Sequence, residues 1–226
     1  ELRTPLTTFR LYTEMLADGM VSDPEKQKTY HLTLQKEAGR LGHLVENVLA
    51  YARLERGRAR NTPEVLSAAE MLERLAPRLE WQARQGGMEL TWKPFDDEVR
   101  LEVDVSLVEQ ILTNLVDNAV KYAGNGGGGT WIHLETRVDG RFLDIHVKDD
   151  GPGVSSTMTR RLFRPFSKSA HEAAHSAPGV GLGLALSRRL ARSLGGDLLL
   201  AANGPAGACF VLRLPLVSAA IRRPSV

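Results

Sequence analysis

The chain has 226 residues, of which 42% are apolar and 25% are charged, so it is long enough to bury a medium domain and a smaller one. A net charge of +2, with no basic stripe interleaved with aromatic residues, excludes a typical nucleic-acid-binding surface. The single cysteine, Cys209, excludes a disulfide framework and fits a reducing compartment, and no run of about eighteen apolar residues could span a membrane.

The N-terminal region is predicted to form a helical hairpin whose first helix stops near Asp18 and Gly19. Mostly apolar residues alternate four and three apart in both helices, as in a heptad seam. These residues are Leu2, Leu6, Phe9, Thr13 and Leu16 in the first helix and Leu34, Ala38, Leu41, Val45, Val48 and Ala52 in the second. A hairpin cannot bury such a seam alone, so we expect a homodimeric four-helix bundle; an arm packed on the rest of the chain is the alternative.

Two starts are open for the second helix. In one, Asp23 caps the helix and Pro24 is its first residue. In the other, Ser22 and Glu25 form a capping box.

A linker rich in Arg, Gly and Asn occupies residues 55–62. A predicted helix follows and ends at about Gln85, before two glycines. Its apolar residues are Leu66, Met71, Leu72, Leu75 and Leu79. Strand-like runs come next at residues 88–92 and 99–103, joined by a polar turn around residues 94–97.

The next helix follows Asp104, which we interpret as its N-cap. Apolar residues recur three and four apart and predict one buried face: Ile111, Leu112, Leu115, Val116 and Ala119. On another face, Asn114 and Asn118 lie one turn apart, with Lys121 one turn further along. Amide oxygens can coordinate Mg²⁺ and a lysine can meet phosphate oxygens, so this face suits a nucleotide; a solvated helix face is the alternative.

Residues 131–138 and 141–148 are predicted to form a hairpin that turns at Asp139 and Gly140. His133 and His146 alternate with apolar residues there, and we interpret them as surface or hydrogen-bonded strand histidines rather than metal ligands. The second strand leads into Asp149, and glycines follow that let the backbone approach a ligand.

A glycine run opens the last predicted helix, which extends to about Leu194. Gly179, Gly181 and Gly183 precede it, so free backbone amides and the positive end of the helix dipole could meet phosphate. The run lacks the last glycine of the dinucleotide fingerprint, and no Walker sequence occurs, so a nucleotide would be bound in another way. Final strands are predicted at residues 197–201 and 208–214, before a tail at residues 218–226.

Four stretches, in this order, resemble the N, G1, F and G2 boxes of the sensor histidine kinases, whose ATP-binding domain is of the Bergerat (GHKL) class. They are residues 114–122, 149–153, 162–166 and 179–184. At the N-terminus, Glu1, Thr4 and Pro5 resemble the His-Glu-x-x-Thr-Pro motif of the HisKA-type phosphoacceptor domain. The histidine position lies immediately before Glu1 and is missing from this sequence; we expect the histidine in the parent protein.

The resemblance implies an α+β fold in two parts. Residues 1–57 would form the helical hairpin that dimerises as a four-helix bundle, followed by a linker at residues 58–62. Residues 63–216 would form an α/β sandwich of the Bergerat ATP-binding type, and residues 217–226 a tail. Residues 154–178 would cover the nucleotide as a mobile lid.

The resemblance also implies ATP and Mg²⁺ as ligands. Asp149 would accept a hydrogen bond from the adenine amino group, which selects a donor-bearing base; a turn-capping aspartate is the rival interpretation. Asn118 would bind Mg²⁺, with Asn114 beside it. The other implied ATP-binding residues are Lys121 on a phosphate oxygen, Tyr122 near the purine or ribose, Gly151 and Gly153 at the base, Phe163 and Lys168 in the F box, and Gly179, Gly181, Gly183 and Leu184 at the phosphates. The chain departs from the family at two positions: Lys168 stands where the family often has arginine, and Arg164 stands where an acid is usual. These departures affect the expected contacts of the lid rather than nucleotide binding.

Transfer would proceed by in-line attack of a histidine nitrogen on the γ-phosphate, with Mg²⁺ neutralising charge. Glu1 is the candidate base, and Thr4 would position water for dephosphorylating an aspartate of a response regulator. The implied partners are a second copy of this chain and a receiver domain, with no nucleic acid and no membrane contact by this fragment. We expect a cytoplasmic location, with an inner-membrane anchor open for the parent protein.

Two other functions stay open. One is a non-catalytic scaffold that binds nucleotide or partners, and the other is a serine kinase or ATPase of the same GHKL class. The Glu-x-x-Thr-Pro helix speaks against the second, because those relatives lack it. The residue before Glu1 in the parent protein would separate a kinase from a scaffold.

Overall fold

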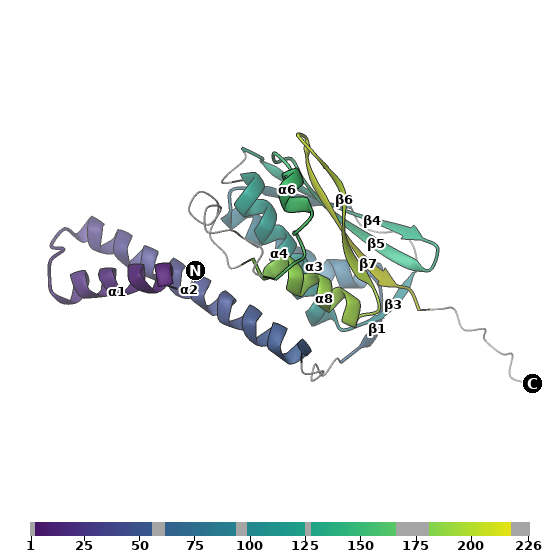
Figure 1. The fold of residues 1–226 in the computed structure, drawn as a ribbon, viewed down its shortest axis with the longest axis horizontal. Coiled ribbons are helices and arrows are strands. Elements are labelled where there is room, and N and C mark those ends of the chain that lie inside the picture. The colour runs from purple at the N-terminus through teal and green to yellow at the C-terminus, as the bar shows by residue number, and fades with distance from the viewer. Residues whose placement is uncertain (1–2, 56–61, 94–98, 125–127, 166–180, 218–226) are drawn as a thin grey trace, which may run out of the picture.

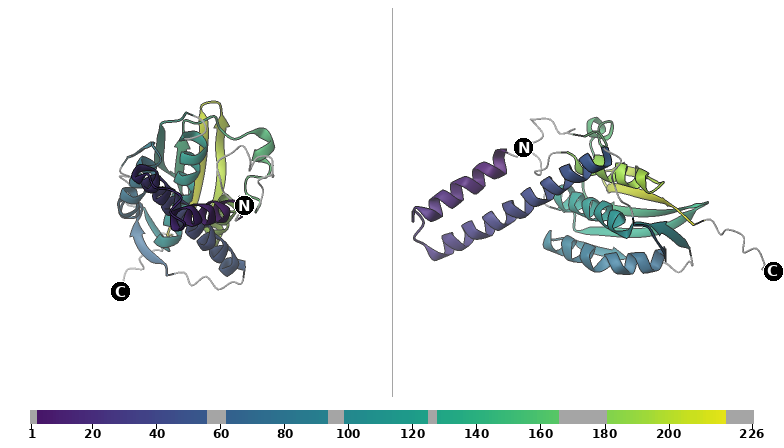
Figure 2. Two further views of the ribbon diagram at one scale, coloured as in Figure 1. Left: turned by 90° about the vertical axis from the view of Figure 1, so that its left-hand side faces the viewer. Right: turned by 90° about the horizontal axis from the view of Figure 1, so that it is seen from below.

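A helical hairpin projects from one end of an α/β part (Figure 1), and two further views show the same arrangement (Figure 2). This computed structural model describes residues 3–55, 62–93, 99–124, 128–165 and 181–217. The turn expected around residues 94–97 and the tail at residues 218–226 lie outside these ranges.

The hairpin consists of α1 (Arg3–Ala17) and α2 (Pro24–Glu55). Asp23 Oδ1 accepts a hydrogen bond from the backbone N–H of Glu25 at 3.0 Å, and Pro24 is the first residue of α2. The start with Asp23 as cap is therefore confirmed over the capping box of Ser22 and Glu25. Tyr12 and Tyr30 stack between the helices with their ring centroids 4.5 Å apart.

The hairpin leaves much of its apolar surface open. Leu6 and Leu11 of α1 are 54% and 50% exposed, and Leu32 and Val45 of α2 are 58% and 53% exposed. Of these four, Leu6 and Val45 belong to the expected seam, and the seam residues Phe9 and Leu16 are only half-buried. Two helices alone thus do not remove this stripe from water, as the heptad pattern predicts.

The α/β part contains a five-stranded sheet in the order β2-β4-β5-β7-β6. Its strands are β2 (Glu89–Trp92), β4 (Trp131–Asp139), β5 (Phe142–Asp149), β6 (Asp197–Gly204) and β7 (Gly207–Pro215). The expected hairpin of β4 and β5 and the final strand pair are confirmed, while β2 lies parallel to β4. The predicted strand at residues 99–103 is β3 (Arg100–Val103), which pairs instead with β1 (Glu64–Ser67) in a separate two-stranded sheet.

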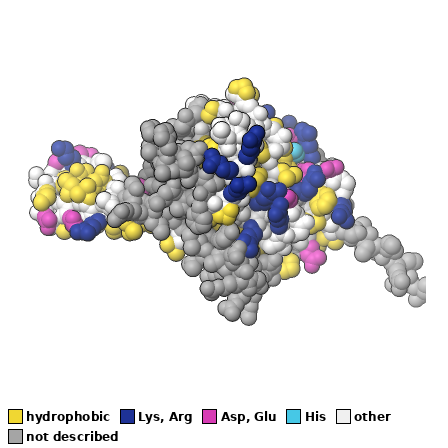
Figure 3. Space-filling model, viewed as in Figure 1, with side chains coloured by type: hydrophobic (Ala, Val, Ile, Leu, Met, Phe, Trp, Pro, Cys, Tyr) yellow, Lys and Arg dark blue, Asp and Glu magenta, His cyan; other side chains and the backbone are white. Residues whose placement is uncertain are grey.

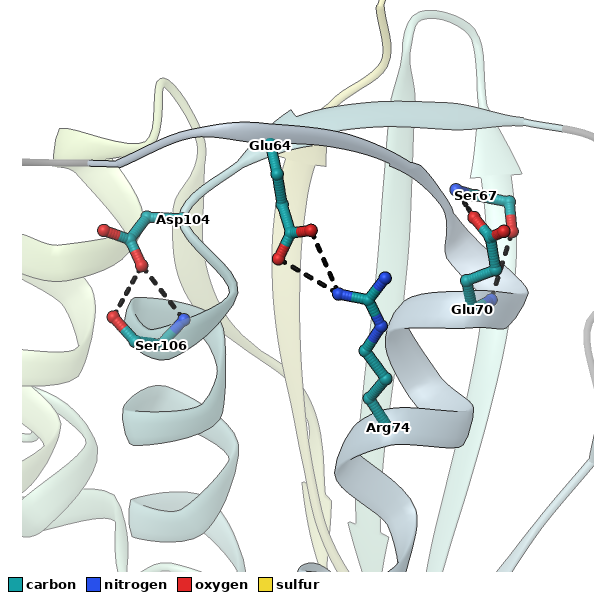
Figure 4. A network of polar contacts seen from close by, with 6 residues as sticks. All are labelled: Glu64, Ser67, Glu70, Arg74, Asp104 and Ser106. Atoms are coloured by element: carbon teal, nitrogen blue, oxygen red, sulfur yellow. Dashed lines mark hydrogen bonds and ion pairs between the residues drawn. The ribbon is translucent and has the colours of Figure 1, made fainter.

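The expectation that Leu66 belongs to the helix after the linker is wrong. Leu66 lies in β1 rather than in the helix that follows, because Leu66 pairs with Leu101 of β3 and is 2% exposed. The helix α3 (Ala68–Gln85) starts after Ser67, whose hydroxyl accepts the N–H of Glu70 while the Glu70 carboxylate accepts the N–H of Ser67 (Figure 4). This capping box sets the boundary between strand and helix.

Helices α3, α4 (Val105–Ala119) and α8 (Gly183–Ser193) cover one face of the five-stranded sheet (Figures 1 and 2). Their apolar faces and the inward side chains of the strands form one core. Fully or almost fully buried members are Met71, Leu79, Ile111, Leu112, Ile132, Leu143, Ile145, Leu190, Ala191 and Leu212. This packing fixes the helices on the sheet and hence the segments at their ends.

The chain end of β7 joins the two sheets. Leu216 forms a bridge with Leu101 of β3, and the N–H of Val217 donates to the carbonyl of Arg100 at 2.8 Å. Through the described ranges, no helix is both long and apolar enough to cross a lipid bilayer.

The ion pair between α8 and β6 yields a prediction for acid stability. Burial acts to raise the pKa of Asp197, but hydrogen bonds from Arg188, Arg192 and the N–H of Leu198 lower it to about 2. The folded chain therefore gains stability from this carboxylate at neutral pH and loses it as the pH falls from about 4 through about 2. We expect Asp197→Asn to cost roughly 2 kcal/mol of unfolding free energy at pH 7 and to flatten the acid limb of the stability curve, measured by urea unfolding at several pH values.

Glu64→Gln is the matched control for this experiment. It breaks the ion pair of Glu64 with Arg74, whose side chains are 47% and 53% exposed (Figure 4). An exposed pair is worth at most about 1 kcal/mol, so equal losses in the two variants would contradict the assignment.

Candidate functional site

The polar face of α4 is built by the packing of its apolar face. Asp104 caps the helix, as expected, and accepts the N–H of Ser106 at 3.0 Å. With the apolar side chains in the core, Asn114 and Asn118 lie half-buried on the polar side. A π-helical turn η1 (Val120–Gly124) continues the helix. Such turns are rare and often lie at functional sites.

Asn114 connects α4 to the start of α8. Its side-chain N–H donates to the hydroxyl of Ser187 at 2.8 Å, and Ser187 is 2% exposed. A Cβ atom on Gly183 would lie 2.3 Å from Asn114 Oδ1, so any larger residue there would force the Asn114 amide to move. Ser187 was not identified from the sequence, because its partner is 73 residues away along the chain.

Asn118 carries an unsatisfied polar atom. Among the residues that the structure describes, its Nδ2 is buried and lacks a hydrogen-bond partner. Buried polar atoms are usually hydrogen-bonded, so an unpaired amide here indicates a place for a ligand or an ordered water. The amide also carries an oxygen, which is a ligand type that Mg²⁺ accepts. The residue thus fits the predicted metal and phosphate role.

Lys121 and Tyr122 lie in η1 and are half-exposed. The ammonium group of Lys121 forms an ion pair with Asp117, one turn earlier. Because the side chains of this pair are 34% and 39% exposed, the contact is a weak one that an incoming anion could replace.

Asp149 lies at the end of β5 and is 8% exposed. Its Oδ1 accepts hydrogen bonds from the N–H groups of Gly151 at 3.0 Å and Ala208 at 3.2 Å. Burial raises the pKa of this carboxyl, the two hydrogen bonds oppose the rise, and the neighbouring Asp150 adds to it. Both hydrogen bonds of Asp149 to described residues go to the same oxygen, so the other oxygen is the atom that could accept a donor from a ligand.

The neighbouring acid has a different position. Asp150 accepts the N–H groups of Thr130 and Trp131 at 2.9 to 3.1 Å, together with the Thr130 hydroxyl. Burial acts to raise its pKa, but these bonds leave the pKa below its ordinary value. Asp150 therefore anchors the start of β4, and only Asp149 is directed into the core.

Close backbone packing brings the end of β5 against η1. A Cβ atom on Gly151 would lie 2.4 Å from the Cβ of Ala123, which follows Tyr122 directly. The predicted base-binding residues therefore lie beside η1, which continues α4. Gly153 comes next, and the side chain of Asn203 clamps the following Val154 through both its N–H and its carbonyl, each at 2.6 Å. Asn203 was not identified from the sequence.

The segment after Gly153 passes over α8. It contains the short helix α6 (Ser156–Thr159), and the guanidinium of Arg188 lies 4.7 Å from the centroid of the Phe163 ring. Arg188 is itself held by Asp197, with nitrogen–oxygen distances of 2.8 and 3.0 Å. Phe163 is thus fixed on α8 rather than free.

The start of α8 offers backbone donors. Its N-cap residue, Leu182, makes no side-chain capping bond. The N–H groups of the first turn therefore have no intrahelical acceptor or capping side chain among the described residues, which suits an anion. Gly181 and Leu184 are half-buried beside Gly183 at this end.

Positive charge surrounds the same region. Figure 3 shows Lys and Arg side chains gathered over α6 and α8. Arg160, Arg161 and Arg164 are exposed there, and none of the three forms an ion pair with another described residue. A group of exposed guanidinium groups raises the local concentration of anions.

The structure thus brings together Asn114, Gly183 and Ser187 on one side, and Asp149, Gly151 and η1 on the other. Glu1, Lys168 and Gly179 lie outside the described residues. Thr4 lies in α1, with its side chain outside the description. The predicted phosphotransfer residues are therefore not placed against the site.

Two family descriptions match this sequence. Residues 103–218 match the family "Histidine kinase-, DNA gyrase B-, and HSP90-like ATPase" (HATPase_c), and residues 1–57 match the "His Kinase A (phospho-acceptor) domain" (HisKA).

Similar proteins include two named as bacterial sensor proteins. Sensor protein SrrB of Staphylococcus aureus (strain N315) is 28% identical over 215 residues, which are 95% of this chain and 36% of SrrB. Sensor histidine kinase WalK of Bacillus subtilis (strain 168) is 28% identical over 198 residues, which are 88% of this chain and 32% of WalK. The chain thus spans about a third of the length of these relatives.

Solved structures share the fold. Full-length ShkA in complex with AMPPNP is 28% identical with a TM-score of 0.65, covering 97% of this chain and 44% of ShkA. Histidine kinase ThkA in complex with the response regulator protein TrrA is 22% identical with a TM-score of 0.71, covering 96% of this chain and 59% of ThkA.

The contact between α4 and α8 yields a second prediction. We expect Gly183→Ala to lower the unfolding free energy by about 1 to 3 kcal/mol, because its Cβ would overlap Asn114 Oδ1. Gly204→Ala is the matched control, since a Cβ there meets no atom within 4 Å. Urea unfolding of both variants tests this contact, and equal stability of the two would contradict it.

Proposed function

Because this chain belongs to the two-component sensor histidine kinases, with a HisKA domain followed by a HATPase_c domain, we propose that it binds ATP and Mg²⁺ between α4, the end of β5 and the start of α8. The observation that carries the proposal is the buried carboxylate of Asp149, whose Oδ1 is held by two backbone N–H groups. Its second oxygen is the acceptor for the adenine amino group. A charged hydrogen bond of this kind is worth roughly 1.5 to 3 kcal/mol.

The phosphates are proposed to lie at the uncapped start of α8, with Gly181, Gly183 and Leu184 around them. Lys121 would exchange Asp117 for a phosphate oxygen. Asn118 would hold Mg²⁺ through its amide oxygen, and the metal would neutralise charge on the phosphate oxygens. The structure of ShkA with AMPPNP, a kinase with the same fold, supports a nucleotide in this domain.

Asn114 takes a different part in the proposal from the one that the sequence predicts. Its amide is engaged with Ser187 and abuts Gly183. We therefore assign to Asn114 the orientation of the phosphate-binding helix end, beside the metal ligand Asn118.

The phosphoryl group is proposed to pass to a histidine immediately before Glu1 in the parent protein, with Glu1 as the base, and then to an aspartate of a response regulator. The complex of ThkA with TrrA supports a response regulator as partner. Dephosphorylation of that aspartate, assisted by Thr4, is a second proposed activity. Lys168 and Gly179 are proposed to contact the nucleotide from the segment outside the description.

A homodimer through the hairpin belongs to the same proposal. Leu6 and Val45, which both belong to the expected seam, are 54% and 53% exposed, which leaves apolar seam positions for a second copy. Burying a leucine or valine side chain is worth about 1.5 to 3 kcal/mol, so a shared bundle core has a substantial driving force.

The proposal is tested by Asp149→Asn. An asparagine can still accept both backbone N–H groups, but its amide nitrogen then faces the adenine amino group, donor against donor. We expect the affinity for Mg²⁺-ATP to fall by roughly 10- to 100-fold, measured by calorimetry.

Asp150→Asn is the matched control, because the Asp150 carboxylate is directed to Thr130 and Trp131. Equal affinity in the two variants would contradict the role of Asp149. If the unsubstituted chain bound no ATP, the scaffold function would replace the kinase.

The two proposed activities are separated by Thr4→Ala in the parent protein. We expect loss of the hydroxyl to slow dephosphorylation of the response regulator far more than autophosphorylation, because Thr4 lies one helical turn past the histidine and is proposed to position water. Both rates are followed with labelled phosphate. Equal losses in the two rates would exclude this role.

A further inference from the structure

A buried carboxylate joins the end of the linker to the helix that bears Asn114 and Asn118. Asp104 lies between β3 and α4 and is 5% exposed. Its Oδ1 accepts the N–H and the hydroxyl of Ser106 at 3.0 and 2.5 Å, which are the two contacts drawn in Figure 4. Its Oδ2 accepts the N–H of Thr62 at 3.0 Å, with the Thr62 hydroxyl at 3.4 Å.

This arrangement exceeds what capping requires. A helix N-cap needs one acceptor for the N–H groups of the first turn, and Ser, Thr, Asn or Asp can supply it. Here the second oxygen serves a residue 42 positions earlier in the chain. Thr62 is also the first described residue after the segment 56–61 that leaves α2. The Asp104 side chain therefore contacts both Thr62, at the end of the linker, and the first turn of α4.

The neighbouring strands support the same contact. Glu64 pairs with Val103, so Thr62 approaches Asp104 as β1 begins to run along β3. From α3, Arg74 holds Glu64 at 3.0 and 3.1 Å (Figure 4). Burial acts to raise the pKa of Asp104, but the hydrogen bonds from Ser106 and Thr62 leave the pKa below its ordinary value. The carboxylate is therefore charged and accepts all of these bonds at neutral pH.

We propose that Asp104 is a positioning residue for phosphoryl transfer, because it fixes the end of the linker to the helix that carries Asn114 and Asn118. This inference rests on the proposed function. From Glu55, the last residue of α2, a fully extended chain to Thr62 spans at most roughly 25 Å. The anchor at Thr62 thus limits where the hairpin can present a phosphoacceptor to the nucleotide. Small errors in such placement slow a transfer strongly without altering ligand binding.

Asp104→Asn in the full parent protein tests the proposal. Asparagine is as good an N-cap as aspartate, so it keeps the bonds from Ser106, but its Nδ2 is a donor and cannot accept the N–H of Thr62. We expect the autophosphorylation rate at saturating ATP to fall about tenfold, with the Kd for ATP changed less than twofold. Thr62→Pro removes the same N–H and should have a similar effect.

Asp104→Asn and Thr62→Pro remove the same hydrogen bond, so the double variant should be no slower than the slower single variant. Thr62→Val keeps the N–H and is the control for proline. Ser106→Ala weakens only the capping oxygen and should lower the Tm without lowering the rate. Additive rate losses, or a Kd for ATP that rises in step with the rate loss, would overturn the proposal.

A separate readout distinguishes this proposal from the proposed function. If the parent protein formed no phosphohistidine, the proposed function would fail. Hydrogen exchange at the Thr62 amide would still test whether Asp104 holds Thr62. Faster exchange in Asp104→Asn than in Ser106→Ala supports the anchor. Equal exchange in the two variants overturns it.

Discussion

The contact between α4 and α8 determines where the other parts of the site lie. Asn114 donates to the buried Ser187, and its amide oxygen occupies the space that a side chain on Gly183 would take. This places the start of α8 beside the half of α4 that carries Asn118. A helix end that offers free N–H groups is useful only when it faces the right neighbour. The apolar core fixes both helices on the sheet, and this polar contact fixes their relative rotation.

Charge is arranged around that contact in two ways. Acidic groups near the site are engaged: Asp149 holds backbone N–H groups, and Asp197 holds Arg188. Exposed arginines follow α6 without acidic partners among the described residues. Near the site, Asp149 and Asp197 are therefore held by donors of the protein, while the arginines after α6 are exposed. Arg188 makes two contacts: its guanidinium pairs with Asp197 and also stacks on the ring of Phe163.

Local patterns predicted most of the fold, and long-range contacts account for what they missed. Periodicity identified α4 and its buried face, Asp104 was recognised as a cap, and the turn at Gly140 gave the β4–β5 hairpin. Leu66 was assigned to a helix because its strand is only four residues long and pairs with β3 across a distant part of the chain. Ser187 and Asn203 act through partners 73 and 49 residues away, which no spacing rule can reveal. The sequence identified the glycines of the site, but not why glycine is needed there. The reason is steric, because Gly151 and Gly183 lie against Ala123 and Asn114 in the folded chain.

The position of β7 has a consequence for biosynthesis. This strand lies between β5 and β6, supplies the Ala208 N–H to Asp149, and ends where Leu216 and Val217 join the two sheets. Because β7 follows β5 and β6 along the chain, the Asp149 carboxylate lacks its contact with Ala208 until β7 has been synthesised. Until then one edge of β5 has no partner strand, and an unpaired strand edge favours aggregation or binding by chaperones.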